Sequence, residues 1–177
     1  YGMFYNLGAL ANERLVPQKK AKQALAQYAK LHPHNIAQKV VVIVEHFREH
    51  VAAKIGGKAK AMLVTDSRKA AVRYKLAIDR YIQERKYLDL HTLVAFSGAV
   101  DDPDSGPDEF TESGMNAAIL GQEPSEAFKQ DEYRILLVAN KYQTGFDQPL
   151  LHTMYVDKRL SGVLAVQTLS RLNRMYP

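Results

Sequence analysis

Three polar side chains near the end of the chain have a spacing that suits phosphate binding. Gln167, Arg171 and Arg174 follow one another at intervals of four and three residues, so on a helix they share one face. Two guanidinium groups one turn apart repel each other unless an anion lies between them, and each planar group can bind phosphate through two hydrogen bonds. The spacing therefore predicts a phosphate-binding face, with an ordinary solvated face as the alternative.

A second polar group follows the apolar run of residues 134–139. This run contains neither Gly nor Pro, and turn-forming residues follow it, which predicts a buried central strand of a parallel sheet. Lys141, Thr144, Gly145 and Asp147 would then lie just beyond the carboxyl end of that strand. Ligands of open α/β sheets bind at this edge.

Other apolar runs predict the elements that position these side chains. We expect further strands at residues 60–65, 92–96 and 151–157, and a helix over residues 163–174 after a Ser161-Gly162 turn. A helix of about five turns is expected to follow Asp66-Ser67-Arg68 and to end at Arg85. Ser67 and Arg68 could hold a phosphate at the start of that helix, or Ser67 could be an ordinary helix cap.

The first 57 residues predict a linker and a helical segment that enters the domain. A helix is expected over residues 18–31, and a second one after His32-Pro33, with Asn35 as its N-cap. Apolar residues recur along the second helix at intervals of three and four, which predicts one buried face, and Gly56-Gly57 is expected to end it.

Two metal sites can be considered from the sequence, and neither is favoured. His46 to His50 fits the H-x-x-E-H zinc pattern, but no convincing third ligand follows, so a solvated or nucleic-acid-facing side is preferred. The aspartates between residues 101 and 108 lack the Glu that completes an EF-hand calcium loop. We therefore predict no metal site within the chain.

The distribution of charge suggests a polyanionic partner. Residues 1–100 carry 17 Lys and Arg against 7 acids, residues 101–132 carry 1 against 10, and residues 133–177 carry 6 against 2. A basic body gains affinity for nucleic acid by releasing counterions, although solubility alone is the alternative. The acidic part, about residues 100–123, is expected to be a mobile surface insertion.

The order of the motifs resembles the second RecA-like domain of superfamily 2 helicases and translocases. Thr144-Gly-Phe-Asp-x-Pro149 and Gln167-x-x-x-Arg-x-x-Arg174 resemble motifs V and VI, and the strand leading to Ser67-Arg68 is similar to motif IV. More closely, residues 138–174, with the runs LHTMYVDK and AVQTLSRLNR, look like the motor of the restriction (R) subunit of type I restriction-modification enzymes. Ser170 stands where many helicases have Gly, and the type I subfamily shares this substitution.

This resemblance implies a three-layer α/β RecA-like domain with a mainly parallel sheet over residues 58–177, preceded by an N-terminal helical connector. The chain begins at Tyr1 and ends three residues after Arg174, so we expect a segment of a longer polypeptide, truncated after motif VI. The absence of cysteine from the sequence is compatible with a reducing cytoplasm, and the resemblance implies a bacterial or archaeal source.

The resemblance also implies a role for each candidate residue. Arg174 would be the arginine finger of an ATP site, with Arg171 as a second contact to the γ-phosphate and Gln167 as a polar positioning group. Asp147, with Gly145, would couple nucleotide binding to DNA. The contacts to the DNA backbone would come from Thr144, Ser67, Arg68 and Lys141.

No phosphate-cradling loop or acidic magnesium site is evident in the sequence. ATP and Mg²⁺ would therefore be bound mainly by a preceding RecA-like domain, and the chain by itself is expected to hydrolyse no ATP. The implied partners are duplex DNA, a preceding motor domain and nuclease domain in the same polypeptide, and the modification and specificity subunits, without a membrane. The second domain of another superfamily 2 helicase or remodeller, or a non-catalytic DNA-binding module, are the alternatives.

Overall fold

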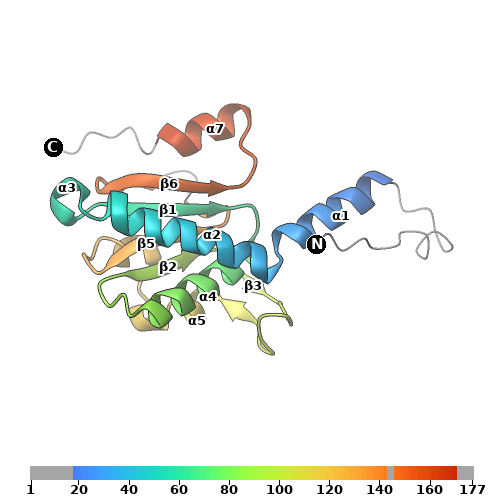
Figure 1. The fold of residues 1–177 in the computed structure, drawn as a ribbon, viewed down its shortest axis with the longest axis horizontal. Coiled ribbons are helices and arrows are strands. Elements are labelled where there is room, and N and C mark those ends of the chain that lie inside the picture. The colour runs from blue at the N-terminus through green and yellow to red at the C-terminus, as the bar shows by residue number, and fades with distance from the viewer. Residues whose placement is uncertain (1–17, 143–145, 171–177) are drawn as a thin grey trace.

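Four parallel strands form the centre of the structure, a computed structural model that describes residues 18–142 and 146–170 (Figure 1). The strands lie in the order β2 (His91–Ala95), β5 (Tyr133–Val138), β1 (Lys60–Thr65) and β6 (Leu151–Asp157). Every neighbouring pair runs parallel. The four predicted strands are thus confirmed to within one residue at either end, and β5 is central as expected.

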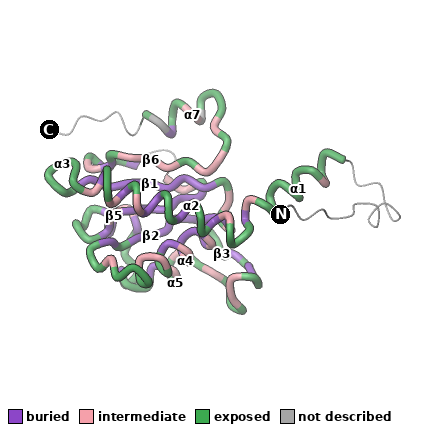
Figure 2. Tube along the Cα trace, in the orientation of Figure 1, coloured by how far each residue is buried: buried purple, intermediate pink, exposed green. Residues whose placement is uncertain are grey.

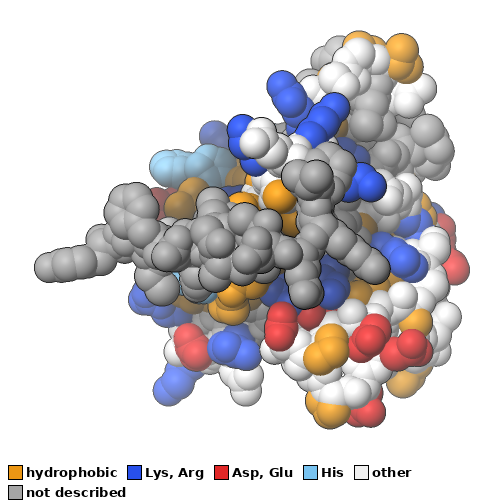
Figure 3. Space-filling view, turned by 90° about the vertical axis from the view of Figure 1, so that its right-hand side faces the viewer, with side chains coloured by type: hydrophobic (Ala, Val, Ile, Leu, Met, Phe, Trp, Pro, Cys, Tyr) orange, Lys and Arg blue, Asp and Glu red, His pale blue; other side chains and the backbone are white. Residues whose placement is uncertain are grey.

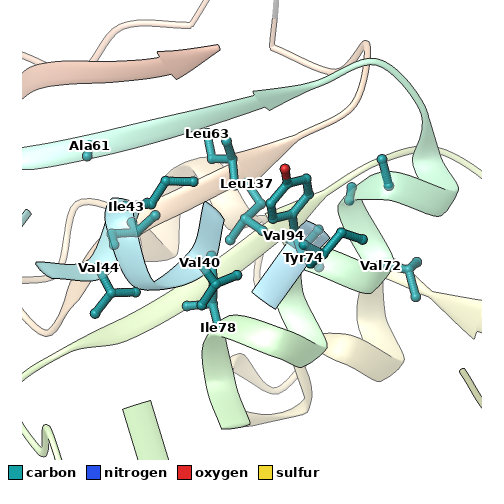
Figure 4. Close-up of a cluster of buried hydrophobic side chains, with 14 of the residues drawn as sticks. Val40, Ile43, Val44, Ala61, Leu63, Val72, Tyr74, Ile78, Val94 and Leu137 are labelled. Carbon is teal, nitrogen blue, oxygen red and sulfur yellow. The ribbon is translucent and has the colours of Figure 1, made fainter. Parts of the chain in front are cut away.

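One face of the sheet packs against two helices, α2 (Pro33–His46) and α4 (Arg68–Arg85). Strand residues alternate between the faces, and Figure 4 shows Leu63 and Leu137 directed toward Val40 and Tyr74 of these helices. Each fully buried aliphatic side chain of this kind contributes roughly 1.5 to 3 kcal/mol. The cluster therefore joins the N-terminal helical region to the sheet in a single core.

Short elements cover the opposite face. Met62 and Leu136 point into a second cluster, which is closed by η3 (Ala117–Ile119), α6 (Pro124–Ala127), Phe128 and Phe146. A parallel sheet buried on both faces needs such a cover. Figure 2 shows β1, β2 and β5 largely buried, whereas the edge strand β6 is buried only at Leu151. The predicted three-layer α/β architecture of the RecA-like type is confirmed.

The start of α2 differs from the prediction, because the N-cap is His32 and not Asn35. Pro33 occupies the first helical position, where its missing N–H costs nothing, and His32 Nδ1 accepts a hydrogen bond from the His34 amide at 3.3 Å. The Asn35 side chain instead donates to the carbonyls of Ala29 and Lys30, at 3.3 and 3.4 Å. It satisfies the end of the preceding helix, α1 (Gln18–Lys30).

α1 was predicted correctly as a helix, but its apolar stripe is not buried. No residue of α1 is buried, and Leu25 and Tyr28 are 49% and 66% exposed. Figure 2 accordingly shows α1 as an exposed helix that projects from the body.

The second predicted helix is divided into three pieces. α2 continues directly into a π-helical turn, η2 (Phe47–Val51), and a short helix α3 (Lys54–Gly57) follows. Phe47 and Val51 remain buried across the change, so the predicted apolar face is confirmed. Arg134 of β5 donates to the carbonyls of Ala52 and Ala59, at 2.9 Å and 2.8 Å, and fixes this turn beside the sheet.

The acidic segment is built into the fold, so its prediction as a mobile surface insertion is wrong in this respect. It contains a small antiparallel pair, β3 (Ala99–Val100) and β4 (Phe110–Thr111), followed by α5 (Glu112–Met115). The buried Asn116 side chain accepts from the Val94 amide at 3.0 Å and donates to the Val94 carbonyl at 2.7 Å, along the free side of β2.

A buried ion pair provides the second anchor of this segment. Asp102 is 1% exposed and accepts two hydrogen bonds from the Arg73 guanidinium, at 2.6 and 2.7 Å, and one from the Ser105 hydroxyl at 2.6 Å. Arg73 also donates to Asp104 at 2.8 Å and to the Leu31 carbonyl at 2.9 Å. Mainly through the hydrogen bonds from Arg73, the pKa of Asp102 is lowered to about 2. Net charge along the sequence could not reveal this role.

Asp102→Asn is expected to lower the free energy of unfolding by about 2 kcal/mol at pH 7, the value of a pKa lowered from 3.8 to about 2. A carboxyl group whose pKa is lower in the folded than in the unfolded protein stabilises the fold at pH values above its unfolded-state pKa. This stabilisation is lost as the pH falls to the folded-state pKa. The difference between the wild type and Asp102→Asn should therefore narrow between pH 4 and pH 2, as measured by urea unfolding. A difference that stays constant over this range would contradict the assignment.

Candidate functional site

The carboxyl ends of all four strands meet at one edge of the sheet because every pair is parallel. The arrowhead of β6 in Figure 1 points to this edge, on the side where α1 lies. Ser67 and Arg68 follow the end of β1 here and Lys141 follows the end of β5, as predicted, whereas Asp147 comes four residues before the start of β6. The Thr65 hydroxyl, fully buried, donates to the Val138 carbonyl at 3.0 Å and holds the ends of β1 and β5 together.

Ser67 is the N-cap of α4. Its hydroxyl accepts from the Ala70 amide at 3.1 Å, and its backbone is extended, as a cap requires. The α4 boundaries match the prediction. The structure thus gives Ser67 the capping role, and a contact to phosphate stays a prediction.

Arg68 is exposed at the first turn of α4. Its Nη1 atom donates to the Ser97 carbonyl at 2.9 Å, which links the ends of β1 and β2. Gly98 has a φ of 76° here, and a Cβ atom at this position would lie 2.9 Å from Arg68 Nη1. The positive φ favours glycine at this turn, and a side chain there would also displace the Arg68 guanidinium.

Lys141 does not present its ammonium group to solvent as a simple DNA contact would. The Nζ atom lies 2.8 and 3.0 Å from the two carboxylate oxygens of Glu112 and 3.5 Å from Glu123. Burial would lower the pKa of Lys141, but the hydrogen bond and charge of Glu112 raise it above its ordinary value. This pairing, made across 29 residues of sequence, does not support the predicted DNA contact.

The residues predicted for nucleotide binding are only partly within the described chain. Asp147 is exposed in the loop that leads into β6, and Gln167 is exposed on α7 (Gly162–Leu169), the helix predicted to begin after Ser161. Thr144, Gly145, Arg171 and Arg174 lie outside the described residues, as does the end of the helix predicted to reach Arg174. Their predicted roles stay predictions.

A cluster around Asp157, at the end of β6, was not predicted. Asp157 accepts from Lys39 Nζ at 2.7 Å and from the Tyr74 hydroxyl at 2.6 Å, while Lys30 Nζ donates to the Asp157 carbonyl at 2.9 Å and to Asp66 at 2.6 Å. The cluster attaches α1 and α2 to the ends of β1 and β6. The sequence feature that could have indicated this cluster is an acidic residue, Asp157, at the last position of an apolar strand.

The titration of this cluster follows from its burial and pairing. Burial would raise the pKa of Asp157, but hydrogen bonds from Lys39 and Tyr74 and the nearby lysine charges lower it below the ordinary value. Burial, together with the bond to Asp157, raises the pKa of Tyr74. At neutral pH Asp157 is therefore a carboxylate and Tyr74 a neutral phenol.

The histidines of the H-x-x-E-H sequence lie at the surface beside β6. His46 and His50 are exposed, with ring centroids 5.1 Å apart, and His46 Nδ1 lies 2.8 Å from the Tyr155 hydroxyl. Within residues 18–142 and 146–170, no group of three or more His, Cys, Asp or Glu residues is arranged to hold a metal ion.

Figure 3 presents the side of the molecule on which α1 lies in Figure 1. On this face Lys and Arg side chains lie in the upper part and at the lower left, and most Asp and Glu side chains lie toward the lower right. None of the helices in the described part of the chain is long and apolar enough to cross a membrane.

Comparison with known proteins identifies the family. Residues 122–177 match the family model described as type I restriction enzyme subunit R domain 3. A protein of Methanocaldococcus jannaschii named as the MjaVIIP type I restriction enzyme endonuclease subunit is 30% identical over 158 residues, 83% of this chain. The corresponding MjaVIIIP subunit is 31% identical over 139 residues, 75% of this chain. The chain belongs to the family of type I restriction enzyme R subunits.

The relationship extends to bacterial members of the family and covers a limited part of each relative. The HindI endonuclease subunit of Haemophilus influenzae is 37% identical over 46 residues, 26% of this chain and 4% of its own length. The chain spans 14% and 13% of the lengths of the MjaVIIP and MjaVIIIP subunits. The R-subunit resemblance predicted from residues 138–174 is confirmed.

Asp157→Asn is expected to lower the free energy of unfolding by on the order of 2 kcal/mol, because two charge-assisted hydrogen bonds are weakened in a half-buried site. Urea unfolding at pH 7 measures this. Asp89→Asn is the control, since Asp89 is 78% exposed in its pair with Arg48 and should cost less than about 1 kcal/mol. Equal losses in the two variants would contradict a role for Asp157 in holding the helices.

Proposed function

We propose that this chain forms the second motor domain of the ATP-dependent DNA translocase in a type I restriction enzyme R subunit. One combination of observations supports the proposal. The family match over residues 122–177 includes both the loop that contains Asp147 and the segment with Arg171 and Arg174. The parallel pairing of β5 with β1 places the start of that loop at the same sheet edge as Ser67-Arg68. Ligand sites of open parallel sheets are built at such an edge.

In this proposal the arginines act on ATP held at a boundary between two domains. Arg174 stabilises the negative charge that develops on the transferred phosphoryl group, Arg171 makes a second contact to the γ-phosphate, and Gln167 positions them. Asp147, with Gly145, couples nucleotide binding to DNA. Because the sequence contains no phosphate-cradling loop, ATP and Mg²⁺ are assigned mainly to a preceding RecA-like domain.

The DNA-facing role is assigned to Thr144 and to Ser67 and Arg68, the latter two at the carboxyl edge of the sheet. An excess of 17 basic over 7 acidic residues in residues 1–100 supports a polyanionic substrate. The parent protein would act on duplex DNA in the cytoplasm of a bacterium or archaeon. It would contain the preceding motor domain and a nuclease domain, and would assemble with modification and specificity subunits.

Arg174→Ala in the full-length subunit is expected to abolish ATP-dependent translocation while leaving DNA affinity nearly unchanged. An arginine finger typically contributes about 10³ to 10⁵ in turnover, or roughly 4 to 7 kcal/mol. Single-turnover ATP hydrolysis and a DNA displacement assay measure the two properties. Arg80→Ala, which changes an exposed arginine on α4, is the matched control and should retain both.

The outcome of this experiment also separates the alternatives. Loss of DNA binding with ATP hydrolysis preserved would favour a DNA-binding module over a motor domain. Translocation without any cleavage by the full-length wild type would favour another superfamily 2 motor.

The isolated 177-residue chain is expected to hydrolyse no ATP, with or without duplex DNA. The reason is chemical, since the sequence has no phosphate-cradling loop and no acidic pair that follows a strand in the manner of a magnesium site. Phosphate release from the purified chain, compared with a buffer blank, measures this. Turnover above the blank, reproduced in separately purified samples, would refute the composite site.

A further inference from the structure

Glu112 lies where three segments meet at the carboxyl edge of the sheet. One carboxylate oxygen accepts from the Phe96 amide, immediately after β2, at 2.8 Å. Both oxygens bind Lys141 Nζ, which follows β5, at 2.8 and 3.0 Å. Glu112 itself begins α5, so a single carboxylate connects the acidic segment to the ends of two neighbouring strands.

The residues on either side of Lys141 have a conformation that needs support. Asn140 and Tyr142 both have a φ of 60°, in the left-handed region that non-glycine residues adopt at a cost of roughly 1 to 2 kcal/mol. The Tyr142 hydroxyl lies 3.1 Å from Glu123, which also lies 3.5 Å from Lys141 Nζ. Contacts to the acidic segment thus offset the cost of this backbone.

The ion pair is more enclosed than an ordinary surface pair. The Lys141 and Glu112 side chains are 25% and 19% exposed, whereas those of Lys129 and Glu126 are 59% and 56% exposed. Partial burial strengthens an ion pair that retains its hydrogen bonds. The two pairs therefore offer a test residue and a matched control of the same chemistry.

The short helix that carries Glu112, α5, is held in place at both of its ends. Thr111 Oγ1 accepts from the Gly114 amide at 3.1 Å and caps α5. Beyond α5, the buried Asn116 makes two hydrogen bonds to Val94 of β2. Glu112 is thereby held between two attachments and can fix the position of Lys141.

We propose that Glu112 is a positioning residue that fixes residues 139–142, the first part of the loop between β5 and β6 that also contains Asp147, through its ion pair with Lys141. This rests on the proposed function, in which Asp147 couples nucleotide binding to DNA. The acidic segment then helps to form the proposed motor site, and Lys141 serves as an internal contact that holds the loop. Its predicted contact to DNA is replaced by this role.

The test uses the full-length subunit with Glu112→Gln, Lys141→Met and the double variant. Lys141→Arg keeps the charge, and Glu126→Gln is the matched surface control. Exchange of the backbone amide hydrogens of residues 139–142, measured without ATP, reports how firmly the loop is held. DNA-stimulated ATP turnover, the KM for ATP and the salt dependence of DNA affinity report the consequence.

Glu112→Gln and Lys141→Met should each accelerate exchange in residues 139–142 and lower DNA-stimulated kcat about tenfold, with a small change in KM, because a displaced loop misplaces groups it positions. The double variant should be no worse than either single one, since both remove the same interaction. Lys141→Arg should retain most of the activity, and Glu126→Gln should match the wild type.

Three results would overturn the proposal. The first is unchanged exchange in Glu112→Gln, and the second is a double variant whose loss equals the product of the single losses. The third is tighter DNA binding by Glu112→Gln with a salt slope steeper by about 1, which would mean that Glu112 masks a phosphate contact of Lys141. If the wild type shows no DNA-stimulated ATP hydrolysis, the proposed function fails, while the exchange measurement still decides whether Glu112 holds the loop.

Discussion

The common direction of the four strands is the constraint on which the rest of the structure depends. A single antiparallel strand would send its following loop to the opposite edge and separate Ser67 from Lys141 or Asp157. Parallel pairing instead needs a long connection between successive strands and a cover on both faces. α4 supplies such a connection between β1 and β2, and α2 joins it on the same face. The parallel strand order that places the polar groups at one edge of the sheet therefore also requires the helices that cover it.

Much of this arrangement could be predicted from local sequence. Apolar runs bounded by turn residues located β1 and β6 without error, and Ser67 marked the start of α4. These signals are reliable because buried strands and capped helices impose their residue types over a few neighbouring positions. The family resemblance also depended on order along the chain, and needed no knowledge of three-dimensional contacts.

The failures share a different physical origin. Asp102 and Asn35 were assigned from their own charge or local position, but each is determined by a partner from another element. Lys60 is a further case, since it lies in β1 at 1% exposure and donates to the carbonyls of Gln130 and Tyr133. Mainly through burial, its pKa is lowered to about 8. Tertiary packing decides which charged residues are buried. A count of charged residues along the sequence cannot distinguish buried from exposed ones.

The hydrogen bonds of Arg73 have a consequence for movement. One guanidinium group on α4 reaches the Leu31 carbonyl between α1 and α2, Asp102, and Asp104. Lysine, with a single ammonium group, could not span these acceptors in the plane that the fork of arginine provides. The helix, the junction between α1 and α2, and the acidic segment are thus joined at one point. In any closure against a neighbouring domain they would travel together as a rigid body.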